Sequence, residues 1–564
     1  MRLGYENYEI QVMKDGRWVT ESSRGRRAEA LALAEKFLAR KDCAGARVIA
    51  NKENRDGLMD EEVVFEKTQA ARGGKKLQIT TIETTPPWCD TPRDFFALES
   101  RMLISRVMRS YLEDVSLTPT ELLHTHKDLQ RLQDYENLFP SAVSHIATLQ
   151  VAGTDQPAAD RRNEIFAIVE QITNQAQQAE HLDLPKLSKR FSETLAAASR
   201  VGGEASEYLA MVVLARGLAA KRDWISKLDM LCRMALAETD RKAVLLLDTV
   251  IADVLGANVI QEVLGWKRSL GAAIIAMLDL ADGKFEVEES DAVDTVAMLD
   301  RLFAADALPA SRHVMIDRAM QQLKSSAPLY RSDPSKEMEE YQRVLARLMV
   351  PGGILSGAHA AEALTMRGAR FVEQGGATGR RAAIGATVKA LPDPARGVMY
   401  LAELTNTSFA DEHLGDIVAE LDVVFSARVI DELCRRASSP KDRMMTATGA
   451  YKATTSSALP DDIKSQVADH IDGVLERYLI DENIIDKLDS PDSHIRDRAV
   501  RLVKFCGAGV LPEGKALNMA RRRIVELLRQ PNFDSHFLEG IADAAAAEKA
   551  LRGFHKLLLG AGLA

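Results

Sequence analysis

The sequence predicts a mainly α-helical protein that carries a small ββαββ module at its N-terminus. Three observations support this fold class. Alternation of apolar and polar residues with a period of two is confined to roughly the first seventy residues. Later segments repeat apolar residues at helical spacing, between short joints containing Pro or Asp. Hydrophobic residues make up 46% of the chain but aromatic residues only 5%, which favours helix-forming cores of Leu, Ala, Val, Ile and Met.

The N-terminal module is predicted from two hairpin patterns with a helix between them. Tyr8, Ile10 and Val12 alternate with polar residues, and Asp15-Gly16 then supplies a turn before a returning strand that begins at Trp18. The segment RRAEALALAEKFLAR places its apolar residues on one helical stripe. The segments ARVIAN and EVVFEK follow as a second strand pair, on either side of a polar connection that contains Asp56-Gly57. We therefore assign residues 1–72 to an α/β module.

A linker and two helical domains are expected to follow. Residues 73–91 contain paired glycines, a threonine-rich stretch and Pro86-Pro87, a composition typical of a linker whose middle can still pair as an edge strand. Thr91-Pro92 and Thr118-Pro119 each place a capping residue and a first-turn proline before an apolar stretch, which predicts two helix starts. We expect one helical domain over residues 92–350 and another, with repeat-like character, over residues 351–564. The body is then an irregular helical array or an α-solenoid-like stack.

One segment of the second helical domain resembles a known repeat. In KLDSPDSHIRDRAVRLVKFCG, residues 487–507, an Asp-Pro turn precedes a helix with Ile495, Ala499, Leu502 and Val503 on one packing face. This pattern resembles the second half of a HEAT repeat. The resemblance implies a helical superhelix that serves as a scaffold or binding surface. No fixed repeat period extends over the whole chain.

Charge and cysteine content narrow the class of protein. The chain has a net charge of −9, and phosphate binding needs a concentrated basic surface, so we expect no nucleic-acid partner. The five cysteines include no CxxC pair, which favours a reducing compartment. No stretch is apolar enough to predict a signal peptide or a membrane span. We therefore expect a cytoplasmic protein without a membrane partner.

Few residues suggest chemistry. His124 and His126 form an H-x-H pair, but residues two apart on a helix point to different sides, so we expect no metal site. No cofactor fingerprint is complete, and we expect no cofactor. The candidate ligand-binding residues are basic side chains near two helix starts and one histidine close to the second of them: Arg24, Arg26, Arg27, Arg380, Arg381 and His359. No catalytic residue is predicted.

Two functions remain open at this point. The leading hypothesis is a non-enzymatic cytoplasmic scaffold or adaptor that binds protein partners through a helical surface, with the N-terminal module as a second recognition element. The alternative is a ligand-responsive regulator or enzyme whose phosphate or nucleotide site is assembled between distant helices, with Arg380, Arg381 and His359 near it. A polar-lined pocket with perturbed titratable groups would favour the regulator, whereas an open concave surface would favour the scaffold.

Overall fold

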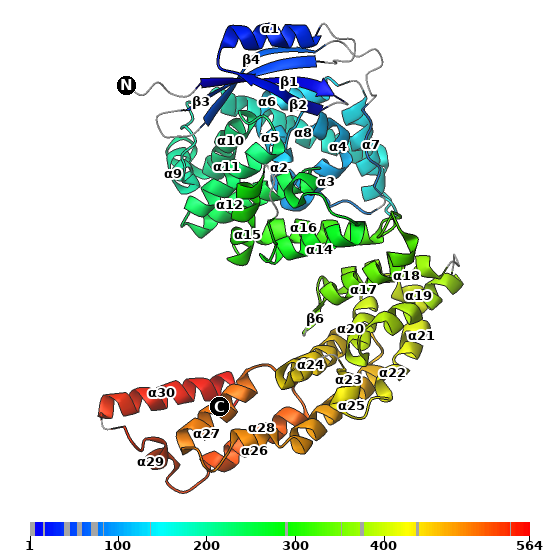
Figure 1. Ribbon diagram of the computed structural model, residues 1–564, viewed down its shortest axis with the longest axis vertical. Helices are drawn as coiled ribbons and strands as arrows, with labels where there is room; N and C mark the ends of the chain where they lie inside the picture. Colours follow the sequence, from blue (N-terminus) through cyan, green and yellow to red (C-terminus); the bar gives the residue numbers. More distant parts are fainter. Residues whose placement is uncertain are drawn as a thin grey trace. The chain divides into compact units, whose positions relative to one another are not determined.

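The computed structural model confirms the predicted fold class, because a small antiparallel sheet is followed by a mainly helical body (Figure 1). The structure describes residues 6–14, 17–38, 45–53, 59–68, 77–82, 84–135, 137–287, 292–350, 352–372, 377–435, 439–541 and 543–563. The turn residues Asp15-Gly16 and Asp56-Gly57 lie outside this part of the chain. None of the described helices has the length and apolar character that a membrane crossing requires.

The described residues form two compact units. Unit 1 comprises residues 1–266 and 276–316, and unit 2 comprises residues 267–275 and 317–564. The sheet therefore belongs to the same unit as the first helices. The long continuous part of unit 2 begins at Asp317, before the boundary near residue 350 that the sequence predicts. Independent folding of residues 1–72 and the expected division near residue 350 both stay predictions.

The N-terminal sheet has the predicted ββαββ order. Its elements are β1 (Glu6–Lys14), β2 (Arg17–Arg24), α1 (Arg27–Leu38), β3 (Gly45–Glu53) and β4 (Met59–Thr68). The strands lie in the order β2-β1-β3-β4, and each neighbouring pair is antiparallel. The alternating residues Tyr8, Ile10 and Val12 face α1, which covers one side of the sheet (Figure 1). On β1, Glu9 accepts a 2.7 Å hydrogen bond from Arg222, which ties the sheet to the helices of unit 1.

The predicted linker packs against unit 1 over much of its described length. Leu77 and Ile79 contact the core of the helical part, and Ile82 is buried there. The amide of Thr80 donates to the carbonyl of Val107 at 2.9 Å, and the amide of Ile82 donates to His145 Nε2 at 3.1 Å. Residues 77–82, the described part of this stretch, do not pair as the edge strand that the sequence allowed, because these amides bond to residues of helices.

Helices make up the rest of unit 1. Those that lie wholly in it are α2 (Pro92–Phe96), α3 (Leu98–Val107), α4 (Arg109–Asp114), α5 (Pro119–His124), α6 (His126–Gln133), α7 (Leu138–Gln150), α8 (Ala158–Glu180), α9 (Phe191–Gly202), α10 (Ser206–Ala219), α11 (Trp224–Ala237), α12 (Arg241–Gly256), α13 (Ile260–Leu264) and α15 (Val293–Ala304). Two further helices, α14 (Leu270–Ala281) and α16 (Pro309–Lys324), contain residues of both units. The two predicted helix starts are correct, since α2 and α5 begin with Pro92 and Pro119 behind capping boxes.

Buried charges bind the unit 1 helices to one another. Lys227 of α11 donates to Glu121 of α5 at 2.7 Å, and both side chains are almost fully buried. Arg101 of α3 pairs with Asp253 of α12 at 3.3 Å, and Asp253 also accepts from the amide of Thr120. Because each charge has an opposite charge beside it, the pairs fix which helices are neighbours, whereas loss of one partner would leave an uncompensated buried ion.

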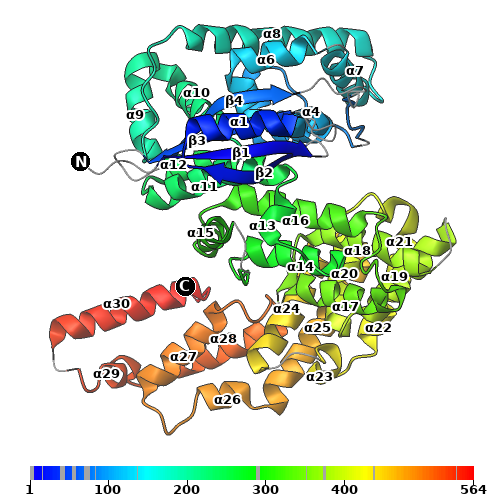
Figure 2. The same cartoon turned by 45° about the horizontal axis from the view of Figure 1, so that its top comes forward.

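Unit 2 is a series of packed helices. Its elements are α17 (Glu337–Leu348), β5 (Met349–Val350), β6 (Gly353–Ile354), α18 (Gly357–Phe371), α19 (Ala377–Ala390), α20 (Pro394–Leu404), α21 (Ala410–Glu420), α22 (Asp422–Phe425), α23 (Ile430–Leu433), α24 (Pro440–Ser456), α25 (Asp461–Asp481), α26 (Ile484–Leu488), α27 (Ile495–Gly507), α28 (Lys515–Leu528), α29 (Phe533–Phe537) and α30 (Ala544–Gly560). Along the chain α18 packs on α19, α20 on α24, α24 on α25, and α25 on α28 (Figure 2). Short joints between consecutive helices permit this neighbour-on-neighbour packing.

The HEAT-like segment, residues 487–507, begins at the end of α26 and contains the whole of α27. Ala499, Leu502 and Val503 are buried on one face of α27, as the pattern predicts. In the preceding turn Asp489 is buried and accepts hydrogen bonds from Arg498 of α27 and Arg523 of α28. The turn is therefore anchored to two helices by charge-assisted bonds, while membership of the HEAT family stays a prediction.

Candidate functional site

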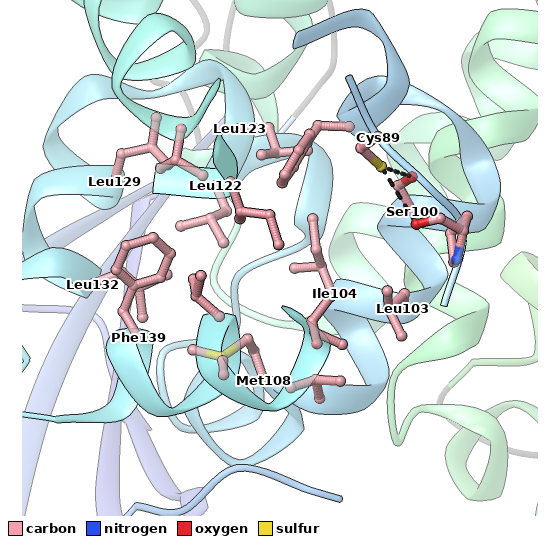
Figure 3. Close-up of a pocket in the computed structure, with 18 of the residues that line it drawn as sticks. Cys89, Ser100, Leu103, Ile104, Met108, Leu122, Leu123, Leu129, Leu132 and Phe139 are labelled. Carbon is pink, nitrogen blue, oxygen red and sulfur yellow. Dashed lines mark hydrogen bonds between the residues drawn. The ribbon is translucent and has the colours of Figure 1, made fainter. Parts of the chain in front are cut away.

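The candidate site is a pocket among the first helices of unit 1. It is enclosed by the segment before α2 and by residues of α2, α3, α5, α6, α7 and α8, and its volume is about 110 Å³. These elements surround a space because each turns an apolar stripe toward the same centre. Figure 3 shows the lining residues around this space.

Most of the pocket wall is aliphatic or aromatic. Leu122 and Leu123 of α5 line it, and so does Met108, the residue that follows α3 (Figure 3). Leu132 and Phe139 close the end contributed by α6 and α7 (Figure 3). Such a wall offers dispersion contacts and no hydrogen bonds, so it favours an apolar occupant over water.

One end of the pocket is polar. Cys89 Sγ lies 3.4 Å from Ser100 Oγ, and this pair is at the end opposite Leu132 and Phe139 (Figure 3). Two further polar residues, Gln150 and Arg161, complete the lining. An occupant with an apolar body and one small polar group therefore has a preferred orientation in the pocket.

Arg161 holds the polar end in place. Its guanidinium is buried; Nε donates to Gln150 Oε1 at 2.8 Å and Nη2 donates to the carbonyl oxygen of Cys89 at 2.6 Å. Nη1 donates to Glu164 at 2.8 Å, and this hydrogen bond lowers the pKa of that carboxyl. The ring of Trp88 covers the guanidinium, with its centroid 3.9 Å away. The cation thus joins the chain before α2 to α7 and α8.

The pocket has little acid–base chemistry. Burial raises the pKa of the Cys89 thiol, so it stays protonated near neutral pH and is a poor nucleophile. Arg161 is the other titratable lining residue, and a guanidinium does not exchange protons at neutral pH. With no base beside a nucleophile, this geometry is suited to binding and not to catalysis.

The N-terminal arginines that the sequence analysis identified lie outside this pocket. Arg24 ends β2 and donates to its neighbouring carbonyl, that of Ser23, at 2.7 Å. Arg26 lies 3.7 Å from Glu29, and its side chain is 83% exposed. Arg27 begins α1 and is exposed. These three side chains form an exposed corner of the sheet module, which leaves their role in ligand binding a prediction.

The second predicted group of ligand residues lies in unit 2 and faces carboxylates. On α19, Arg380 lies 3.5 Å from Glu412 and Arg381 lies 3.2 Å from Asp416, both on α21. His359 of α18 lies 3.8 Å from Asp317. A phosphate would have to compete with these acids for the cations, so the pairing gives the phosphate-site hypothesis no support. The Gly375-Gly376 pair beside Arg380 lies outside the described residues.

The H-x-H pair was expected on a single helix, but His124 ends α5, His126 begins α6, and Thr125 between them has extended backbone angles. His124 is buried and stacks on Tyr208 with ring centroids 5.0 Å apart, while His126 lies 3.5 Å from Glu180. Within the described part of the chain, no cluster of three His, Cys, Asp or Glu residues is arranged to hold a metal ion.

Sequence reasoning missed the pocket, although one residue carried a signal. Arg161 occupies the buried stripe of α8 that continues through Ile165, Ile168 and Ile172. A lone cation at an apolar stripe position indicates either a buried ion pair or a polar site. Here it marks the polar end of the pocket.

Comparison with protein-family models, with curated proteins and with solved structures gives no match to this chain. The pocket and the helix packing are therefore the observations on which a function can be built.

Proposed function

We propose that this protein binds a small apolar molecule in the pocket among α3, α5, α6, α7 and α8. The supporting observation is the pocket of about 110 Å³ with an aliphatic wall and one polar end. A dry cavity of 150 Å³ in another protein accommodates benzene, so a volume of about 110 Å³ suits a group of about four to six carbon atoms. The ligand class is thus a short aliphatic or aromatic molecule with at most one small polar group.

Occupancy of the pocket would act on the stability of unit 1. At about 24 cal/mol per Å³ of enclosed cavity, a space of about 110 Å³ sets an upper limit of roughly 3 kcal/mol on what filling it can contribute. A ligand that restores the missing dispersion contacts recovers part of that amount, and it stabilises the folded state by mass action. This coupling is the mechanism of a ligand-responsive regulator, with an apolar ligand in place of the phosphate first considered.

The test uses benzene and the full chain. At ten times its dissociation constant, benzene should stabilise unit 1 by about 1.4 kcal/mol, seen by calorimetry as a rise in unfolding temperature of about 2 °C. Ala142→Leu, which places three more carbon atoms at the pocket wall, should abolish the rise. Absence of a benzene effect on the wild-type chain, or an equal effect on the variant, would refute the proposal.

A second proposed function is the scaffold predicted from the sequence, a non-enzymatic protein that binds partners through unit 2. It is supported by the succession of packed helices from α18 to α28, the kind of arrangement that helical repeat proteins use as a binding surface. The edge strands β2 and β4 and the exposed Arg26 corner remain its second recognition element. Affinity purification of the full chain should recover a partner in constant stoichiometry, and recovery of none would count against this function.

A cytoplasmic location belongs to the same proposal. It is supported by the four described cysteines, all of which are buried free thiols, as expected in a reducing compartment. They are Cys89, Cys232, Cys434 and Cys506.

A further inference from the structure

A groove runs between two helices at the C-terminal end of unit 2. Helices α27 and α30 pack on each other in both views (Figures 1 and 2), and they leave a hollow of about 350 Å³ along their contact. Val503 of α27 and Leu557 of α30 supply its apolar floor. The groove therefore has an apolar floor, with α27 on one side and α30 on the other.

A glycine in the middle of α30 keeps the groove open. Gly553 lines the groove, and a Cβ atom built on it would meet no heavy atom within 4 Å. Glycine inside a helix lowers stability by about 1 kcal/mol relative to alanine. No described atom of this chain would clash with a Cβ atom at this position, so packing within the chain does not explain the glycine. Gly507 and Gly560, at the ends of the two helices, also line the groove. An incoming backbone can thus approach α30 closely.

The groove is positively charged although the protein is acidic. Lys504 stands on the α27 wall and Lys556 on the α30 wall, and no acidic residue lines the space between them. Residues 495–564 contain twelve Lys and Arg against seven Asp and Glu, net +5, in a chain of net charge −9. Neighbouring basic side chains are paired within the chain, as Arg521 is with Glu513 and Arg552 with Glu548. Among the described residues, neither of the two lysines forms a salt bridge.

We infer that the α27–α30 groove docks an acidic amphipathic helix of a partner protein. The floor of the groove would receive the apolar stripe of that helix, the Gly553 gap would allow close helix packing, and the two lysines would pair with carboxylates along its flanks. Charge complementarity selects an acidic partner over a basic one. The inference deepens the proposed scaffold function and rests on it.

The probe is a fluorescein-labelled peptide of about 18 residues, long enough to form a helix on binding, with leucine at i, i+3, i+4 and i+7 spacing and glutamate elsewhere. Its affinity for the full chain is measured by fluorescence anisotropy. The glutamate peptide should bind, and a peptide with lysine in place of every glutamate should not. Equal binding of the two peptides would overturn the inference.

Variants locate the binding. The double variant Lys504→Glu, Lys556→Glu should bind the glutamate peptide with about tenfold or more lower affinity. Lys549 is an exposed lysine on α30 outside the groove, and Lys549→Glu should change the affinity less than about twofold. Gly553→Leu should also weaken binding without lowering the unfolding temperature, because a Cβ atom there meets no heavy atom within 4 Å and leucine favours helix over glycine. An equal loss of peptide affinity in Lys549→Glu would overturn the inference. So would competition by nucleic acid: a single-stranded oligonucleotide that displaces the peptide from the wild-type chain, and that no longer binds the Lys504 and Lys556 variant.

The two levels of the proposal fail differently. If affinity purification recovers a stoichiometric partner that the Lys504 and Lys556 variant still retains, the groove assignment is wrong and the scaffold function stands. If no partner is recovered by the wild-type chain, the scaffold function itself fails.

Discussion

Filling the pocket should stabilise the protein, which is the reverse of the usual effect of enlarging a buried residue. Ala142 of α7 is buried and lines the pocket, so Ala142→Leu adds three carbon atoms to an apolar space of about 110 Å³. At about 0.8 kcal/mol per buried methylene the gain is close to 2 kcal/mol. In a unit of this size that corresponds to a rise of about 3 °C in unfolding temperature, which differential scanning calorimetry resolves.

The matched control is the same substitution on the same helix. Ala147 is also buried, but it packs in a cluster with Val143, Ile165 and Val169 and does not line the pocket. Ala147→Leu should therefore overpack the core and cost about 1–3 kcal/mol. Opposite signs for the two variants would establish the space beside Ala142. If Ala142→Leu destabilises unit 1 as much as Ala147→Leu does, the pocket is not available to a ligand and the proposed ligand site must be abandoned.

Three further predictions concern the framework of unit 1. Lys227→Met leaves Glu121 buried without its counter-ion, although Thr118 still donates to the carboxylate, and should cost about 3–5 kcal/mol, most of it recovered when Glu121→Gln is added. Hydrogen exchange of α5 amides measures both losses, and additive losses would contradict the pairing. Burial lowers the pKa of His124 to about 4, so the unfolded chain takes up the proton first and stability should fall, on the order of 3 kcal/mol, between pH 6.5 and pH 4. Urea midpoints test this, and an unchanged slope in His124→Gln would exclude His124 as the cause. Gly283 and Gly153 both have positive φ, but of the two only Gly283 has backbone in the way of a Cβ atom, which would lie 2.2 Å from the nitrogen of Ala304. Gly153→Ala should lower the free energy of unfolding by about 1–2 kcal/mol. Gly283→Ala should lower it by roughly 2 kcal/mol or more beyond that, as measured by guanidinium unfolding.

Local periodicity explains why the fold class was predictable. Strand residues such as Tyr8 and Ile10 are apolar and alternate with polar neighbours. The starts of two early helices are indicated by the Thr-Pro caps at Pro92 and Pro119. These signals depend on residues a few positions apart, so they survive without knowledge of the tertiary structure. The expected edge strand after residue 76 failed because its partners, Val107 and His145, belong to helices that no local pattern connects to it.

The candidate site was not predictable in the same way. The pocket forms where apolar stripes from six helices leave a space between them, and such a space depends on helix crossing geometry that sequence spacing does not encode. The basic clusters at Arg26 and Arg380 were predicted as ligand-binding residues because they are local charge patterns. In the structure Arg26 lies beside Glu29, and Arg380 lies beside Glu412. Isolated charges on apolar stripes were the better guide.

Buried charges in this protein mark where remote segments must meet. Asp248 and Asp253 interrupt the apolar sequence of α12; the first accepts from the amides that begin α16, and the second pairs with Arg101 of α3. Arg161 acts likewise, since it binds the carbonyl of Cys89, 72 residues earlier. The segment before α2 is therefore not a passive linker, because Cys89 is part of the pocket wall and is held there by Arg161 and Ser100. Changes that loosen this segment should therefore act on the pocket as well.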